Sequence, residues 1–185
     1  MSARFARNKS GGDDPEPFDP RQITHPELQR LYVYWRDSGK NEGLPGRSMV
    51  DPVAMRRWLG NITLIDVQQS PLAFRFRLCG SSFVERIGID PTGADLTAIP
   101  DADYRRKIEE VFSKMMVTRE PSISRNRRHI AGRAYDFEVL RLPLAEDGHT
   151  VSTLLICPMY FEAPPLSYAV GTGRSPEFKA PTWLE

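Results

Sequence analysis

The sequence predicts an α+β fold in which a five-stranded antiparallel sheet carries helices on one face, with an N-terminal helical extension. Two stretches, 28–35 and 104–116, repeat their apolar residues with helical spacing. Five other stretches have strand composition: 62–67, 73–79, 122–130, 133–142 and 151–160. Short turn sequences separate the last three, which favours a meander of antiparallel strands.

Composition places the chain among ordinary globular proteins. Of its 185 residues, 40% are apolar, enough to bury a core of the usual size. The formal charge of +1 creates no field over the whole chain that would attract nucleic acid or an anionic membrane. No apolar run approaches the ~18 residues of a spanning helix, and the N-terminus lacks the apolar core of a signal peptide. We expect a cytoplasmic protein that does not associate with membranes.

Three segments follow from the distribution of glycine, proline and apolar residues. Residues 1–22 and 162–185 are rich in Gly and Pro and have little apolar periodicity, so we expect two flexible tails. The 139 residues between them, 23–161, are close to the usual size of one domain.

The N-terminal part of the domain predicts two helices and two strands. Thr24 and Glu27 have the spacing of a capping box before a helix that ends near Gly39. Asp51-Pro52 predicts a short helix that runs through Trp58. A β-branched strand over 62–67 follows, and then a half-buried strand over 73–79 whose core-facing residues are Phe74, Phe76 and Leu78.

The remainder predicts two more helices and the meander. Ser82 and Glu85 suggest the cap of a short helix that ends at Gly88. A long amphipathic helix extends from Asp101 to Thr118, and Pro121 stops it. The last three strands are joined by turns at 131–132 and 146–149.

Several local sequences resemble those of small, single-domain, bacterial PAS-like proteins. They are Leu31 with Tyr34-Trp35, Leu44-Pro45-Gly46-Arg47 before Asp51-Pro52, the strand 74–79 with Gly80-Ser81, and Ile87-Gly88 with Asp90-Pro91-Thr92-Gly93. The resemblance covers about 27–160. Ser81 stands where the family often has Thr, and Pro91 where it has Leu. The resemblance implies a PAS fold and regulation through ligand or partner binding, without a reaction.

Catalytic and metal-binding residues are sparse in this sequence. The three histidines, His25, His129 and His149, form no HxxxH pair, and the two cysteines form no CxxC motif. We expect no catalytic residue and no metal site, with Cys79 and Cys157 as core residues. A PAS strand order would place these cysteines on strands that flank 62–67, too far apart for a disulfide. The alternative is a small enzyme with a hydrophobic pocket and a thiol nucleophile.

One basic stretch, 119–133, contains five arginines and a single glutamate. Arg125 and Arg127 share one face of the predicted strand and Arg128 takes the other. Arginines in this arrangement suit a carboxylate-rich partner, so a partner-binding site is predicted at Arg125, Arg127, Arg128 and Arg133. Two alternatives are a charged edge strand that resists aggregation and a binder of nucleic acid or nucleotides, which has little aromatic support here.

A ligand pocket in this fold would lie between the sheet and its helices. The residues expected there are Phe76, Leu78, Phe83, Ile87, Leu96, Phe112, Phe137, Val139 and Leu155. A filled core explains the same residues. The sequence supports neither a flavin photosensor, which needs an Asn-Cys-Arg motif, nor a haem sensor, because 101–118 contains no histidine.

The function predicted is therefore that of a non-catalytic sensory or regulatory module that acts in trans on a signalling protein, with ligand gating if the pocket is open. The resemblance also implies a homodimer, because the N-terminal helix of PAS relatives often packs across a dimer interface. The core would leave the apolar stripe of the first helix uncovered for this contact, namely Leu28, Leu31, Tyr32 and Trp35.

Overall fold

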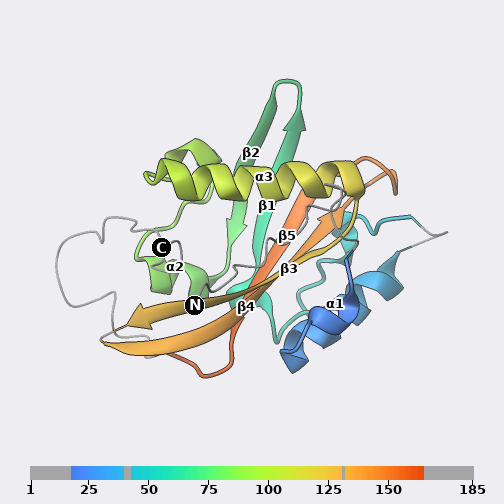
Figure 1. Ribbon diagram of the computed structural model, residues 1–185. Helices are drawn as coiled ribbons and strands as arrows, with labels where there is room; N and C mark the ends of the chain where they lie inside the picture. Colours follow the sequence, from blue (N-terminus) through green and yellow to red (C-terminus); the bar gives the residue numbers. More distant parts are fainter. Residues whose placement is uncertain (1–17, 40–42, 131, 165–185) are drawn as a thin grey trace, which may run out of the picture.

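A five-stranded antiparallel sheet organises the residues that the structure describes, 18–39, 43–130 and 132–164 of a computed structural model (Figure 1). The strands are β1 (Thr63–Gln69), β2 (Leu72–Cys79), β3 (Ser122–Ile130), β4 (Arg133–Leu144) and β5 (Thr153–Tyr160). Their order across the sheet is β2-β1-β5-β4-β3, so the C-terminal meander extends one side of the β1–β2 hairpin. The predicted α+β class and strand number are confirmed.

Helices cover both faces of this sheet. Helix α3 (Ala102–Thr118) runs across the strands in Figure 1, and α2 (Ser81–Ile87) precedes it. Helix α1 (Pro26–Ser38) packs on the opposite face through Leu28, Leu31 and Trp35. We call the face under α3 the inner face and the face under α1 the outer face. The predicted helices therefore lie on the inner face, and the predicted N-terminal helical extension packs on the other face.

The two faces have separate apolar cores. The inner core packs Phe112 and Met115 of α3 against strand residues, and its buried members also include Ile65, Phe74, Phe76, Leu96, Ile99, Val151 and Leu154. The outer core combines α1 with alternate residues of β4 and β5, among them Leu140, Leu142, Leu144, Leu155 and Cys157. Because neighbouring strand residues point to opposite faces, β5 supplies both cores, with Leu154 in the inner one and Leu155 in the outer one.

Strand β2 departs from the predicted alternation near its end. Leu64 pairs with Leu78 but Ile65 pairs with Phe76, so Arg77 is an extra residue in a bulge. A bulge shifts the alternation of the residues beyond it. Leu78 is therefore 44% exposed, while Phe74 and Phe76 are buried as expected.

Three predicted helix starts differ from the structure. His25 caps α1, because its Nδ1 accepts a hydrogen bond from the Glu27 N–H. Gly80 caps α2, without a bond from the predicted Ser82. Residues 52–58 form consecutive turns with mixed hydrogen-bond spacing instead of a regular helix, although the Asp51 carboxylate does accept two backbone N–H bonds there.

The long helix and the meander follow the prediction closely. Asp101 caps α3, and the helix ends at Arg119, which adopts a left-handed φ of 59°. Gly132 and Gly148 have φ values of 78° and 77° in the two hairpin turns, where a side chain would be strained. β4 extends two residues beyond the expected end, to Leu144, because Pro143 and Leu144 continue the pairing with β5.

Both cysteines are free thiols, as expected. Thr63 of β1 pairs with Cys79 on one side and with Ile156, the neighbour of Cys157, on the other. The two cysteines therefore lie on strands separated by β1, as the resemblance implied.

Part of the predicted N-terminal tail belongs to the folded domain. The Phe18 ring packs against the Tyr32 ring at 5.5 Å between centroids, and the Phe18 N–H donates to Glu120. Residues Pro20–Gln22 form a short 3-10 turn that leads into α1. The rest of both predicted tails, 1–17 and 165–185, lies outside the described residues.

Candidate functional site

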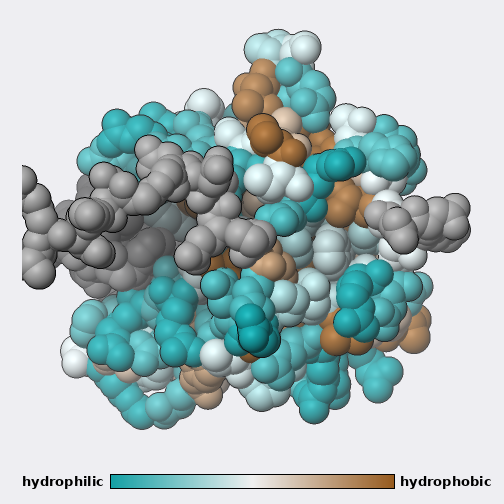
Figure 2. All heavy atoms as spheres, turned by 45° about the vertical axis from the view of Figure 1, so that its right-hand side comes forward, coloured by the Kyte–Doolittle hydropathy of each residue, from teal (hydrophilic) through white to brown (hydrophobic). Residues whose placement is uncertain are grey.

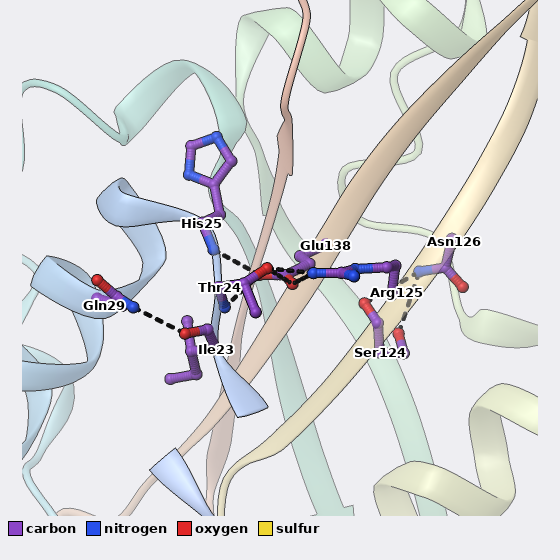
Figure 3. Close-up of polar contacts among 8 residues, drawn as sticks. All are labelled: Ile23, Thr24, His25, Gln29, Ser124, Arg125, Asn126 and Glu138. Atoms are coloured by element: carbon purple, nitrogen blue, oxygen red, sulfur yellow. Dashed lines mark hydrogen bonds and ion pairs between the residues drawn. The ribbon is translucent and has the colours of Figure 1, made fainter. Parts of the chain in front are cut away.

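A polar junction on the outer face joins the start of α1 to strands β3 and β4. The Glu138 carboxylate accepts hydrogen bonds from the backbone N–H groups of Thr24 and His25, at 3.0 and 2.8 Å (Figure 3). The Thr24 hydroxyl and the Arg125 guanidinium also donate to it, and Arg125 donates to the same hydroxyl. One carboxylate thus ties the start of α1 to strands β3 and β4, which follow it by more than 100 residues.

The charge at the centre of this junction is buried, so hydrogen-bond donors must compensate it. The Glu138 side chain is 1% exposed, whereas Arg125, its ion-pair partner at 2.9 Å, is 59% exposed. Burial by itself would raise the pKa of Glu138, but the hydrogen bonds from Thr24, His25 and Arg125 outweigh it and lower this pKa. The carboxylate therefore stays ionised at neutral pH and holds the segment that precedes α1.

Apolar and indole contacts complete the docking of α1. The Trp35 indole N–H donates to the Pro143 carbonyl at 2.9 Å, and the Trp58 indole N–H donates to the Glu27 carbonyl at 3.1 Å. Leu28 and Leu31 are fully buried against the chain's own sheet. The apolar stripe expected to form a homodimer interface is therefore covered within one chain. The homodimer stays a prediction, but this stripe no longer supports it.

The basic stretch that the sequence singled out is largely matched by acids. Arg125 pairs with Glu138, Arg127 pairs with Asp136 through two bonds of 2.6 and 2.9 Å, and Arg133 pairs with Glu162. Two of these acids lie on β4, opposite the arginines of β3. The charge that looked uncompensated along the sequence is therefore compensated across the strands.

Three of the four predicted partner-binding arginines nevertheless remain at the surface. Arg125, Arg127 and Arg133 are each about 60% exposed, and β3 is an edge strand. Phe161 has 47% of its surface exposed and lies beside Arg125, 5.4 Å from the guanidinium and 5.2 Å from the His25 ring. We call Arg125, Arg127, Arg133 and Phe161 the edge strip.

Arg128 differs from these three. It alternates with Arg127 along β3 and thus projects to the inner face, where its guanidinium lies 3.5 Å from the Arg86 carbonyl oxygen of α2. Among the described residues, no carboxylate pairs with it. The structure therefore divides the predicted group into a surface set and one inward arginine.

The nine residues predicted for a ligand pocket do not line one cavity. Phe76, Leu96 and Phe112 pack together in the inner core, and Leu155 belongs to the outer core instead. Leu78 is exposed because of the bulge in β2. Phe83 is half-buried on α2, and the side chain of Ile87 lies outside the described residues.

The last two predicted pocket residues, Phe137 and Val139, are buried on the inner face of β4. The Phe137 ring stacks on the Tyr160 ring at 4.7 Å. A surface hollow of about 330 Å³ lies between Phe74 at the edge strand and Glu109 of α3, and of the nine predicted residues Leu96 lines it. A second, of about 190 Å³, lies between Phe18 and the end of α3.

Polar side chains cover most of the face seen in Figure 2, with apolar groups below the tip of the β1–β2 hairpin. Leu72, which is 48% exposed, begins β2 at this tip. No helix among the described residues is both long and apolar enough to cross a membrane.

Three of the residues considered for chemistry, His25, Cys79 and Cys157, lie in or beside the packed cores. The His25 ring accepts from the Glu27 N–H, and its other nitrogen therefore donates to the Tyr160 carbonyl at 3.2 Å. Burial raises the pKa of the Cys157 thiol to about 12 and also raises that of Cys79. Such thiols are poor nucleophiles. Within the described ranges, no three acidic, histidine or cysteine side chains gather as metal ligands do.

Comparison with known proteins agrees with this architecture. A family model described as PAS domain matches residues 23–157. The chain belongs to the PAS domain family. A match of this extent also identifies it as a small sensory or regulatory domain. A comparison with curated proteins finds no match.

Solved structures of other proteins are similar at a low level. The PAS domain of BvgS from Bordetella pertussis has a TM-score of 0.47 and 14% identity, over 60% of this chain and 83% of that chain. A sensory box sensor histidine kinase from Vibrio cholerae has a TM-score of 0.42 and 13% identity, over 60% and 92%. A light-oxygen-voltage domain studied with a flavin analogue has 0.44 and 14%, over 66% and 91%.

Sequence reasoning missed the centre of the polar junction. Glu138 lies in a strand run, 137–140, that is otherwise apolar on both sides of the alternation. A lone carboxylate in such a run must be buried, and a buried carboxylate needs donors. This signal was present, but the donors Thr24 and His25 come from more than 110 residues away.

Proposed function

We propose that this PAS protein acts in trans on a partner protein through the edge strip. The docking of α1 on the sheet is the feature that changes with the state of the domain. One observation carries the proposal. Arg125 is exposed for a partner and is also bonded to Glu138 and Thr24, the contacts that hold α1. A partner that withdraws the Arg125 guanidinium would weaken the same carboxylate network.

The chemistry of the edge strip favours an acidic protein surface. Exposed arginines bind carboxylates through two parallel hydrogen bonds, as Arg127 already does with Asp136. An exposed aromatic ring beside arginine is typical of protein interfaces. The unpaired side of β3 adds backbone groups that an extended partner segment can pair with.

Ligand gating fits the same arrangement. β4 carries Glu138 toward the outer face and Phe137 toward the inner face, on adjacent residues. A ligand on the inner face that shifts β4 would therefore move the carboxylate that holds α1. The proposal assigns no reaction to the protein.

A nucleic-acid partner is the second reading of the arginines, and their ion pairs with Asp136, Glu138 and Glu162 weaken it. Acids so close would repel phosphates. Steep loss of binding to a polyanion resin with salt would favour this reading.

The experiment uses a surface double variant, Arg127→Ala with Arg133→Ala, which spares the buried partner of Arg125. Tagged protein is incubated with extract of the source cells, and captured proteins are quantified by mass spectrometry. We expect the wild type to enrich a small set of proteins that the double variant loses, while both melt at similar temperatures.

The matched control is Arg75→Ala with Arg106→Ala, which removes two equally exposed arginines elsewhere on the surface. This control should retain the wild-type set. If the edge-strip variant retains it as well, the strip is only a charged sheet edge and the proposal is wrong.

A further inference from the structure

Backbone hydrogen bonds of β4 show which groups of the neighbouring edge strand β3 are unpaired. The Asp136 carbonyl accepts from the Phe161 N–H at 3.1 Å, and the Leu144 carbonyl accepts from the Ser152 N–H at 3.0 Å; Ser152 and Phe161 flank β5. In an antiparallel pair, the N–H and C=O of one residue point to the same side, and this side alternates along the strand. The even-numbered residues of β4 therefore direct their backbone groups toward β5 rather than β3.

The same alternation places the backbone groups of Arg125 and Arg127 at the free edge of the sheet. Arg125 lies opposite Glu138 and Arg127 opposite Asp136, both even-numbered residues of β4. Neither arginine therefore uses its N–H or C=O in the pairing with β4. Among the residues that the structure describes, no other segment makes a backbone hydrogen bond to either of them. An extended segment beside β3 can pair with both.

The side chains of the same two residues lie on the outer face and keep hydrogen-bond donors. Arg127 uses its Nε and Nη2 for the Asp136 carboxylate, at 2.6 and 2.9 Å. Arg125 uses its Nη2 for Glu138, at 2.9 Å (Figure 3). A guanidinium has five N–H donors, so the Nη1 group of each arginine is left over. Because both side chains are about 60% exposed, a further acceptor can reach them.

Strand geometry sets the spacing of the acids that would meet these two arginines. Side chains two residues apart on a strand point to the same face, roughly 6.6 Å from each other. Residues directly opposite on antiparallel strands have Cβ atoms about 4.5–5.5 Å apart. Two carboxylates at positions i and i+2 of an added strand therefore lie opposite Arg125 and Arg127. Carboxylates at i and i+1 point to opposite faces, so only one of them reaches an arginine.

The acids already present on β4 do not prevent this contact. A carboxylate on the added strand lies one strand spacing, ~4.8 Å, from Arg127 and two spacings, ~9.6 Å, from Asp136. The Coulomb energy halves when the distance doubles, and physiological salt screens exposed charges beyond about 8 Å. The attraction to the arginine therefore exceeds the repulsion by the acid. A nucleic acid lacks the amide groups that hold a strand in this register.

We propose that the edge of β3 binds an extended segment of a partner protein that carries acidic side chains at positions i and i+2. The segment lies antiparallel to β3 as a sixth strand, pairs with the backbone groups of Arg125 and Arg127, and places its two carboxylates on their guanidinium groups. The assignment rests on the proposed function, because it names the kind of segment that the edge strip takes.

Two capped peptides of equal composition and charge test the spacing. The probe is Thr-Thr-Glu-Thr-Glu-Thr-Thr, and the control, Thr-Thr-Glu-Glu-Thr-Thr-Thr, has adjacent acids. Binding to the ¹⁵N-labelled full chain is measured by NMR titration at physiological salt. We expect the probe to bind at least about threefold more tightly than the control, and the amides of Arg125 and Arg127 to shift. Equal affinity of the two peptides would overturn the proposal.

N-methylation tests the backbone pairing while keeping both charges. Methyl groups on the two glutamate amides remove the donors that face β3, so binding should weaken at least about tenfold. A methyl group on the amide of the threonine between them, which faces away from β3, should have little effect. Equal binding of both methylated peptides would show surface ion pairs without an added strand and contradict the proposal.

Substitution locates the site. Arg127→Gln should weaken binding of the probe at least about threefold. The matched control is Arg106→Gln, because Arg106 is an equally exposed arginine that also pairs with an exposed acid, Asp103. This variant should bind as the wild type does. The same affinity in both variants would exclude β3 as the site.

Other occupants of the edge give different results. A trinucleotide of thymidine, which also carries two phosphates, would bind more tightly than the probe if the edge takes nucleic acid. Amide shifts along β3 that depend on protein concentration, without any peptide, would show a second copy of the chain at this edge. Either result would overturn the proposal.

The outcome is separable from that of the proposed function. If the probe does not bind but the Arg127→Ala, Arg133→Ala variant still loses its captured proteins, the edge strip docks a partner without an added strand. If the probe binds but this variant keeps its captured proteins, the site for an acidic segment exists and the captured proteins dock elsewhere.

Discussion

The two faces of the sheet differ in whether their charged side chains have partners of opposite charge. On the outer face, the buried Glu138 meets four donors, one of them the arginine that reaches the surface. On the inner face, Arg86, Arg128 and Arg141 lie against aromatic and neutral polar groups, with no acidic partner among the described residues. A satisfied charge network holds elements in place, whereas buried charges without an opposite partner cost free energy.

The first prediction concerns the apolar part of the inner face. Phe112 is buried and meets the Phe74 ring edge-on at 5.2 Å. Phe112→Ala should lower the free energy of unfolding by about 3–5 kcal/mol, because it leaves a cavity in a filled core. Urea denaturation measures this. Val117→Ala, on the same helix but 84% exposed, should change stability by less than about 0.5 kcal/mol; a small loss for Phe112→Ala would indicate an open gap instead.

The second prediction concerns the polar junction on the outer face. Glu138→Ala should cost about 3 kcal/mol, because the backbone N–H groups of Thr24 and His25 lose their acceptor. The tryptophan fluorescence should also change, because Trp35 lies on α1, which loses its polar anchor. Asp136→Asn, which alters a half-exposed acid on the same strand, serves as control and should cost less than about 1 kcal/mol.

The third prediction concerns pH. The folded pKa of Glu138 is lowered, so its contribution is complete above the unfolded value of about 4.3 and is lost as the pH falls through the folded pKa. The stability difference between wild type and Glu138→Ala should therefore shrink below about pH 4. Asp147, whose pKa the Thr150 and His149 N–H groups lower to about 2, affects both proteins equally. A difference that stays constant to pH 2 would show that the carboxylate charge is irrelevant.

The fourth prediction compares one arginine from each face. Arg125→Gln should cost about 1 kcal/mol, because Glu138 loses its cationic donor. Arg128→Gln should stay within about 0.5 kcal/mol of wild type or be slightly stabilising, because it removes an unpaired charge near Arg86. Thermal denaturation at one salt concentration measures both. Equal losses would mean that the two faces do not differ in charge compensation.

The smallest expected effect concerns the cysteines. Under native conditions at pH 8, Cys157, which is buried in the outer core, should not react with a thiol reagent, and the half-buried Cys79 should react slowly. In guanidinium chloride without reductant, both should react. A count of zero thiols in the denatured monomer would reveal a disulfide and overturn the strand assignment.

Much of this protein was determined by local sequence. Apolar periodicity placed α1 and α3, strand composition placed all five strands, and the glycines at 132 and 148 marked hairpin turns, because these signals act between residues close along the chain. The motifs around 74–81 and 87–93 led to the PAS family, which the match over 23–157 confirmed.

Tertiary structure decided which charges are compensated and which face each side chain meets. Sequence alone offered no way to distinguish Arg128 from Arg125, Arg127 and Arg133. In the structure, the last three form ion pairs with acids of β4 or with Glu162. A bulge in β2 left Leu78 exposed, and Leu155 packs in the outer core with α1. These outcomes depend on pairing register and on contacts across more than 100 residues, which periodicity along one strand cannot specify.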